Sequence, residues 1–288
     1  MKELVIISGK GGTGKTSITA SFAALAKNPT LADCDVDAAD LHLLLEPQKL
    51  ATHEFVSGHE AIINQEKCTQ CNICYDVCRF EGILLEDGKV SVDPYSCEGC
   101  KVCVEFCPAD AIDFPESVCG EWYESKTRYG TMIHARLAPA AENSGKLVAQ
   151  VRQAAKEAAE KANSDLILID GPPGVGCPVI ASVTGTTAIL IVAEPTVSGE
   201  HDMERVLKLS VHFEIPALVC VNKWDLNPEV TERIEATALK AGAKIMGRIP
   251  YAKIFTDAMV NGQLVVDHPE TDAAQSIKKI WENICQTI

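Results

Sequence analysis

The sequence predicts a doubly wound α/β fold, in which helices cover both faces of a mostly parallel sheet, with a small α+β domain inserted into it. Two observations support this fold class. Apolar runs at 4–7, 166–169, 187–193 and 217–221 alternate with longer helical patterns, as parallel strands and their crossover helices do. Residues 59–116 differ in composition and contain eight closely spaced cysteines, which indicates a separate inserted unit.

The first apolar run leads into a glycine-rich loop, and a helical pattern beginning at Ser17 follows the loop. This order of strand, loop and helix is that of a P-loop, whose backbone N–H groups and helix N-terminus bind phosphate. Lys15 is expected to reach the β- and γ-phosphates, and the Thr16 hydroxyl is expected to bind Mg²⁺. The residues expected to contact the nucleotide are Gly9, Lys10, Gly11, Gly12, Thr13, Gly14, Lys15, Thr16 and Ser17.

Carboxylates follow two of the other predicted strands. The second strand leads into Asp33 and Asp35, and either Asp37 or Asp40 fits the cap of the next helix better than Asp35 does. The buried run 166–169 ends in Asp170-Gly171-Pro172-Pro173-Gly174. These motifs stand where a P-loop protein needs groups around magnesium and the γ-phosphate.

The loop also contains Lys10, which a plain P-loop does not need. With it, the motifs resemble those of the deviant-Walker-A ATPases, the MinD/ParA group that includes the Mrp-type proteins and the nitrogenase iron protein. The resemblance implies a dimer that hydrolyses ATP with Mg²⁺. It implies that Lys10 reaches the partner's nucleotide and that Asp35 positions the attacking water. It also implies that Asp170 holds Mg²⁺ through a water, and that the Gly174 N–H senses the γ-phosphate.

The end of the chain supplies the expected base-binding residues. The run 217–221 leads into Asn222, which is expected to contact the base edge, and the last strand leads to Pro250 on the nucleotide side. The sequence Asn222-Lys223-Trp224-Asp225 is also the guanine-reading motif of GTPases. The resemblance favours ATP, but Asp225 leaves GTP open.

The eight cysteines form two sets with the spacing C-x-x-C-x-x-C-x-x-x-C, which is the signature of a bacterial two-cluster ferredoxin. In such ferredoxins the fourth cysteine of each set ligates the other cluster. One 4Fe–4S cluster is therefore expected on Cys68, Cys71, Cys74 and Cys107, and the second on Cys97, Cys100, Cys103 and Cys78. Zinc is the alternative metal, but structural zinc sites use four ligands as two separated pairs. Arg79 stands where a proline normally follows the fourth cysteine.

These motifs predict the domain organisation. Residues 1–58 and 117–288 are assigned to the ATPase domain, and residues 59–116 to the inserted ferredoxin-like domain. Inside the insert, Asp87-Gly88 predicts a hairpin, and 111–114 predicts a closing strand.

The charge of the chain favours some classes of binding partner and opposes others. The chain carries a net charge of −14, which opposes binding to nucleic acid. Residues 60–116 hold 12 acidic and 4 basic side chains, a net charge of −8, which favours docking of a basic redox partner. No apolar run has the length of a membrane span, and the first strand begins directly after Met1, so we expect a cytoplasmic protein.

The remaining cysteines and the C-terminal helix have less specific interpretations. Cys34, Cys220 and Cys285 are expected in the core. Cys177 stands where the nitrogenase iron protein has a cluster ligand, so it is either a partly buried structural thiol or one ligand of a bridging cluster. No second ligand is evident for such a cluster, and Cys119 is one conceivable candidate. The apolar stripe of the last helix favours packing on the sheet over membrane binding, and His134 is expected to be a structural, hydrogen-bonded residue.

The leading hypothesis is a dimeric ATPase, homo- or heterodimeric with a related ATPase, that couples ATP binding and hydrolysis to electron transfer through two 4Fe–4S clusters or to control of a redox partner. A scaffold or carrier for iron–sulfur clusters is the first alternative, and an ATP-dependent spatial or regulatory switch is the second. Eight matched ligands favour stable clusters over labile, transferable ones.

Overall fold

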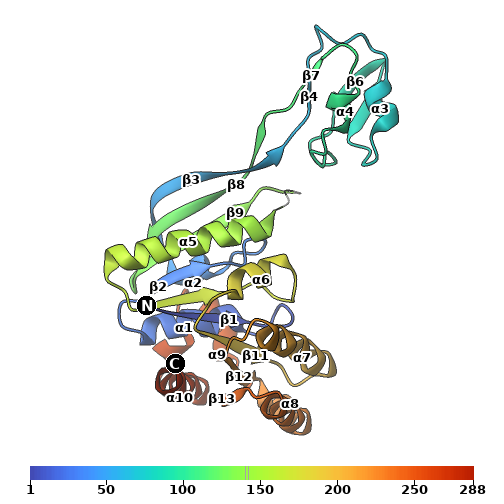
Figure 1. Cartoon of the computed structure of the whole chain (residues 1–288). Coiled ribbons are helices and arrows are strands. Elements are labelled where there is room, and N and C mark those ends of the chain that lie inside the picture. Colours follow the sequence, from blue (N-terminus) through green and yellow to red (C-terminus); the bar gives the residue numbers. More distant parts are fainter. Residues whose placement is uncertain (140, 142) are drawn as a thin grey trace. The chain divides into compact units, whose positions relative to one another are not determined.

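The computed structural model describes residues 1–139, 141 and 143–288 (Figure 1). The described chain divides into two compact units. The larger unit comprises Met1–Thr52, Trp122–Arg136 and Ser144–Ile288, and the smaller unit comprises His53–Glu121 and Leu137–Asn143. The predicted domain boundaries at residues 58 and 117 remain a proposal.

The elements of the larger unit are β1 (Lys2–Ile7), α1 (Lys15–Leu25), β2 (Thr30–Asp33), α2 (Leu41–Leu45), β9 (Thr131–Leu137), α5 (Ser144–Ala162), β10 (Leu166–Asp170), α6 (Cys177–Val183), β11 (Ala188–Ala193), α7 (Val197–His212), β12 (Ala217–Asn222), η1 (Trp224–Leu226), α8 (Pro228–Lys240), β13 (Lys244–Ile249), α9 (Ile254–Val260), η2 (Val265–Asp267) and α10 (Asp272–Thr287). Two long strands, β3 (Gln48–His59) and β8 (Glu116–Lys126), belong to both units along the chain.

One sheet organises the larger unit. Its strand order is β13-β12-β11-β1-β10-β2-β9-β8-β3, and the pairs from β13 through β9 are parallel. The central strands β1, β10 and β11 are buried along nearly their whole length, because helices cover both of their faces. The chain moves outward in both directions from β1, which confirms the predicted doubly wound, mostly parallel fold.

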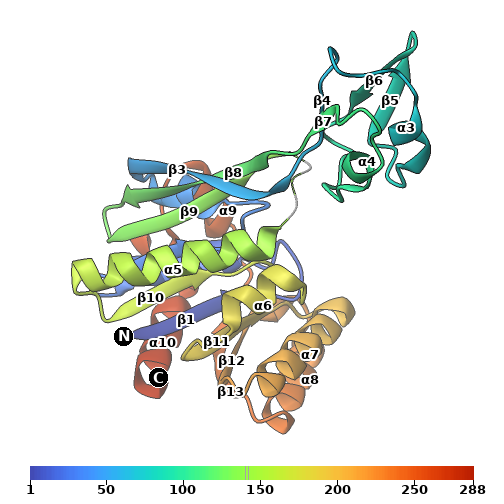
Figure 2. The ribbon, with the colours of Figure 1, turned by 45° about the horizontal axis from the view of Figure 1, so that its top comes forward.

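Helices lie on both sides of this sheet (Figure 2), and successive residues of a strand point to opposite faces. Leu4 and Ile6 of β1 pack in one core with α1 and α10, where the Phe22 and Trp281 rings lie 5.1 Å apart. Helices α5 and α6 to α8 pack against the strands on the other face. The apolar stripe of α10 is buried in this first core, which confirms that this helix packs on the sheet.

Cys285 differs from its prediction. It follows Ile284, which is completely buried, but its own thiol is exposed. One residue advances the side chain by about 100° around a helix, which turns Cys285 off the apolar stripe. Cys34 and Cys220 are buried as predicted.

The smaller unit contains short elements: β4 (Ile62–Ile63), α3 (Ile73–Val77), β5 (Ile83–Glu86), β6 (Lys89–Val92), α4 (Val102–Glu105) and β7 (Ile112–Asp113). Strands β4 and β7 form one antiparallel pair and β5 and β6 another. Asp87 and Gly88 both have positive φ, as a two-residue hairpin turn requires, so the predicted hairpin is confirmed.

Among the residues that the structure describes, no helix combines the length and the apolar character needed to cross a membrane.

Candidate functional site

A cavity of about 550 Å³ lies at the carboxyl ends of β1, β2 and β12. Ligands of doubly wound sheets bind at this edge, where strand order reverses. The residues that line the cavity are Ser8, Gly11, Gly12, Thr13, Gly14, Lys15, Thr16, Ser17, Asp35, Ala38, Asp40, Pro173, Asn222, Lys223, Pro250, Tyr251, Ala252, Phe255, Thr256 and Met259. The structure thus gathers most of the predicted nucleotide-binding residues around one space.

The glycine loop has a fixed shape. Gly14 caps α1 with φ of 89°, and a Cβ at this position would lie 2.5 Å from Nδ2 of Asn222. Asn222 Nδ2 donates a hydrogen bond of 2.7 Å to the Thr13 carbonyl. Asn222 therefore holds the loop in place, in addition to lining the cavity where the base contact is predicted.

Lys15 lies between two of the predicted carboxylates. Its Nζ is 3.1 Å from Asp170 Oδ1 and 3.4 Å from Asp35 Oδ2. Burial lowers the pKa of Lys15, but the Asp170, Asp35 and Asp33 carboxylates outweigh burial and raise it above its usual value. Burial raises the pKa of Asp35, and Asp170 adds to this effect while Lys15 opposes it. The lysine therefore remains cationic, as its predicted contact with phosphates requires.

Asp170 also organises the start of α1. Its Oδ2 accepts a 2.8 Å hydrogen bond from the Thr16 hydroxyl, and its Oδ1 accepts a 3.0 Å bond from Thr19. The predicted magnesium residues Thr16 and Asp170 are therefore in direct contact. Thr19 is a partner that the sequence did not reveal.

Asp33 plays the capping part that was predicted for Asp37 or Asp40. Its two carboxylate oxygens accept from the backbone N–H groups of Asp35 and Leu41, the first residue of α2. Asp40 is at the cap position but makes no side-chain capping bond. Burial, together with the Asp170 charge, raises the pKa of Asp33 well above its usual value.

Lys10 is bound within its own chain. Its Nζ lies 3.1 Å from Glu194 Oε2 and 3.2 Å from Thr196 Oγ1. The other Glu194 oxygen is 2.9 Å from Lys223 Nζ, which also donates to the Gly12 carbonyl at 3.2 Å. Burial raises the pKa of Glu194, but hydrogen bonds from Lys223 and Lys10 outweigh this effect and lower it. The sequence did not point to Glu194, although it follows the carboxyl end of β11.

The far end of the cavity is lined by Pro250, Tyr251 and residues of α9. Asp225 Oδ1 accepts a 2.6 Å hydrogen bond from the Tyr251 N–H. Asp225 is not among the cavity-lining residues. This carboxylate thus anchors the loop that carries Pro250.

Gly174 and Cys177 lie outside the cavity lining, as do Gly9, Lys10 and Asp170. The Gly174 N–H donates to the Ser8 carbonyl at 3.0 Å, so its predicted role toward the γ-phosphate remains a proposal. Cys177 begins α6 and is exposed, which makes the prediction of a partly buried thiol wrong. Cys119 donates through its thiol to the Ser57 carbonyl at 2.7 Å.

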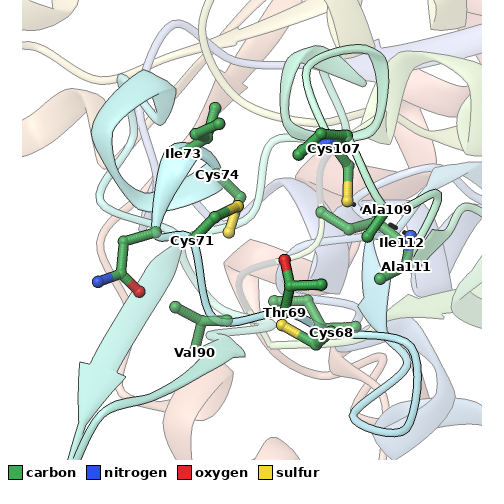
Figure 3. Close-up of a pocket in the computed structure, with 13 residues that line it drawn as sticks. Cys68, Thr69, Cys71, Ile73, Cys74, Val90, Cys107, Ala109, Ala111 and Ile112 are labelled. Atoms are coloured by element: carbon green, nitrogen blue, oxygen red, sulfur yellow. Dashed lines mark hydrogen bonds between the residues drawn. The ribbon is translucent and has the colours of Figure 1, made fainter.

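In the smaller unit, the cysteines surround two separate cavities. The thiols of Cys68, Cys71, Cys74 and Cys107 line the first (Figure 3). Those of Cys78, Cys97, Cys100 and Cys103 line the second. The fourth cysteine of each set therefore stands with the first three cysteines of the other set, which is the grouping that the two-cluster pattern predicts.

These cavities suit iron–sulfur clusters by their donor set. Each combines four thiols with apolar neighbours, and the Ala111 N–H donates to Cys107 Sγ at 3.3 Å, as amides around cluster ligands do. Within residues 1–139, 141 and 143–288, no three His, Cys, Asp or Glu side chains are grouped so that they could hold a single metal ion.

The P-loop, the two carboxylates beside Lys15 and the sheet topology define a P-loop nucleotide-binding protein. The chain belongs to the CobQ/CobB/MinD/ParA nucleotide binding domain family, whose sequence profile matches residues 4–265. It is 32% identical to the uncharacterized protein MJ0578 of Methanocaldococcus jannaschii over 99% of this chain and 97% of that protein.

Two further comparisons concern the fold of the whole chain and a shorter segment of it. MinD of Pyrococcus horikoshii, solved with Mg-ADP, has the same fold, with a TM-score of 0.59 and 17% identity over 99% of this chain and 96% of that one. A segment covering 18% of this chain is 43% identical to 74% of the uncharacterized ferredoxin MJ0722 of M. jannaschii. The smaller unit thus resembles ferredoxins, as predicted.

Proposed function

We propose that this protein is a dimer-forming, Mg²⁺-dependent ATPase whose nucleotide state is coupled to electron transfer through two 4Fe–4S clusters. The observation that carries this proposal is the presence, in one chain, of a P-loop cavity and of two cavities lined by four thiols each. Strands β3 and β8 connect the two sets of residues along the chain.

The nucleotide residues have defined tasks in this proposal. Lys15 binds the β- and γ-phosphates, exchanging its contacts with Asp35 and Asp170 for phosphate oxygens. Thr16 and Asp170, which are already hydrogen-bonded, hold Mg²⁺, which neutralises charge on the phosphates. Asp35 lies 3.4 Å from Lys15 Nζ, and we assign it to positioning the attacking water.

The base is adenine in this proposal. In the guanine-reading motif the aspartate pairs with the purine amine, but Asp225 here accepts a hydrogen bond from Tyr251 and is absent from the cavity lining. Asn222 and Pro250 do line the cavity. The relative from P. horikoshii was solved with Mg-ADP, which also supports ATP.

The cluster residues follow from the two cavities. We assign the first cluster to Cys68, Cys71, Cys74 and Cys107, and the second to Cys97, Cys100, Cys103 and Cys78. When bound, such clusters supply one-electron transfer. The excess of acidic side chains around them opposes reduction and steers a partner with a basic surface.

The test is a redox titration followed by EPR, with and without a non-hydrolysable ATP analogue. Couplings between two sites typically amount to about 1–3 kcal/mol, and about 1.4 kcal/mol corresponds to roughly 59 mV for one electron. We expect the analogue to shift at least one midpoint by tens of millivolts. Unchanged potentials in protein whose dimerisation is confirmed would reject the coupling. Transfer of clusters to an apo-protein would favour the carrier function instead.

A further inference from the structure

The two thiol-lined cavities occupy different positions along the β4–β7 ribbon. Ile63 and Ile112, which pair with each other, line the first cavity. Ala61 and Phe114 line the second cavity. Both of these residues stand on the side of the ribbon where β3 ends and β8 begins. The second cavity is therefore next to the two strands that continue into the larger unit.

A close backbone contact joins the second cavity to the end of β3. Gly99, which lies between Cys97 and Cys100, packs directly on His59, the last residue of β3. A Cβ at Gly99 would lie only 2.3 Å from the His59 carbonyl oxygen. The His59 ring is also stacked on Phe114, with centroids 4.9 Å apart and planes inclined by 9°. Both His59 contacts involve residues lining the second cavity.

The internal repeat shows why a glycine occupies this position. Gln70 holds the corresponding place in the first cysteine set, and its φ of 56° matches the 59° of Gly99. Gln70 is exposed. The left-handed conformation therefore accepts a side chain in the first set, so conformation alone does not require glycine in the second. The approach of the His59 carbonyl does require it.

We propose that the cluster on Cys78, Cys97, Cys100 and Cys103 is the one whose potential responds to β3, through the contact of His59 with Gly99 and Phe114. The other cluster, farther along the ribbon, lacks this contact. This inference rests on the proposed clusters and on their coupling to ATP.

Only a short stretch of chain connects the nucleotide-binding loop to β3. Strand β3 begins at Gln48, with two residues between it and the end of α2, and α2 follows the loop that holds Asp35 beside Lys15. Any displacement of that loop by a nucleotide acts on one end of β3, and His59 is at the other end. Coupling of this kind needs a nucleotide with different affinity for the two arrangements of the strand.

The experiment compares two matched variants, Gly99→Ala and Gln70→Ala, in EPR-monitored redox titrations without nucleotide. Each places an alanine at nearly the same φ, but only the first meets the His59 carbonyl. We expect Gly99→Ala to shift one midpoint and Gln70→Ala to leave both at their wild-type values. Equal effects of the two variants would overturn the inference. The Cys74→Ser variant damages the first cluster and thereby shows which EPR signal belongs to which cluster. A shift of the first cluster's midpoint in Gly99→Ala would also overturn the inference.

His59→Ala provides a second variant if Gly99→Ala does not assemble clusters. It removes the ring from Phe114 but keeps the backbone, and we expect it to shift the same midpoint. No shift in a protein with full iron content would count against the inference.

Adding the ATP analogue separates this inference from the proposed function. A wild-type shift confined to the second cluster supports both, and a tenfold change in analogue affinity on reduction would equal about 59 mV. In Gly99→Ala, we expect the affinity for the analogue to be nearly the same in the oxidised and the reduced protein. No wild-type shift, while Gly99→Ala still moves one midpoint, would overturn the ATP coupling and support the β3 contact. A wild-type shift confined to the first cluster would overturn this inference but leave the proposed function standing.

Discussion

We predict that His134 makes the stability of the larger unit dependent on pH. It lies on β9, is 4% exposed, and its Nε2 is 3.0 Å from Ser125 Oγ. Its ring stacks on His42 of α2 at 5.9 Å. Burial, and then the charges of His42 and Lys49, lower the pKa of His134 from 6.5 to about 4. The folded protein therefore keeps this imidazole neutral at pH values where an exposed histidine binds a proton.

The sign and size of the effect follow from this shift. Because the folded pKa lies below the unfolded pKa, the stabilisation is complete above pH 6.5 and is lost as the pH falls toward 4. At about 1.4 kcal/mol per pKa unit, the whole loss is about 3 kcal/mol, of which about 1 kcal/mol has occurred at pH 5.5. This is a large fraction of the 5–15 kcal/mol that typically stabilises a domain.

The assay is urea unfolding at pH 7.5 and pH 5.5, followed by tryptophan fluorescence. All three tryptophans, Trp122, Trp224 and Trp281, belong to the larger unit, so the signal reports that unit. We expect wild type to lose about 1 kcal/mol more than His134→Gln between the two pH values. His201→Gln is the control, because that side chain is 71% exposed. Equal losses in wild type and His134→Gln would refute the reasoning.

The remaining predictions concern the nucleotide and the clusters. Lys15→Ala is expected to abolish tight ATP binding in calorimetry. Asp35→Ala is expected to bind ATP, hydrolyse it roughly a hundredfold more slowly and accumulate as a dimer in light scattering, and wild-type hydrolysis would remove Asp35 from the mechanism. Lys10→Ala is expected to lose the ATP-dependent dimer, and its persistence would contradict the role of Lys10 across the interface. Anaerobically purified protein is expected to contain about eight iron atoms per chain, with Cys74→Ser losing about half; bound zinc without an iron–sulfur spectrum would contradict this.

Sequence patterns predicted well the elements whose conformation is determined by residues that are close together in the sequence. Continuous apolar runs identified the central strands, because strands covered on both faces expose no side to water. The Asp87-Gly88 hairpin and the P-loop were predictable because their backbone conformations restrict which residues fit. The fixed cysteine spacing likewise predicted which thiols would share a cavity. The apolar, hairpin and P-loop signals are each contained in a few consecutive residues, and the cysteine signal in two short sets of fixed spacing.

Features that depend on neighbours distant in sequence were predicted less well. Asp33 rather than Asp40 accepts the Leu41 N–H, because the end of β2 brings a buried carboxylate to the start of α2. Any of the aspartates in this stretch could cap a helix, and only the packed structure selects one. Asp225 illustrates the same limit, since its bond to Tyr251 joins two loops that follow different strands.

Glu194 shows what such long-range contacts add to the mechanism. A carboxylate that loses its only partner when a salt bridge breaks is left uncompensated, which is costly in a partly buried site. Glu194 binds two lysines at once, and Lys223 is additionally held by the Gly12 carbonyl. If Lys10 leaves to reach a partner's nucleotide, Glu194 therefore keeps one cation. This arrangement lowers the cost of releasing Lys10, so the same contact that holds Lys10 within its own chain is compatible with its proposed role across a dimer interface.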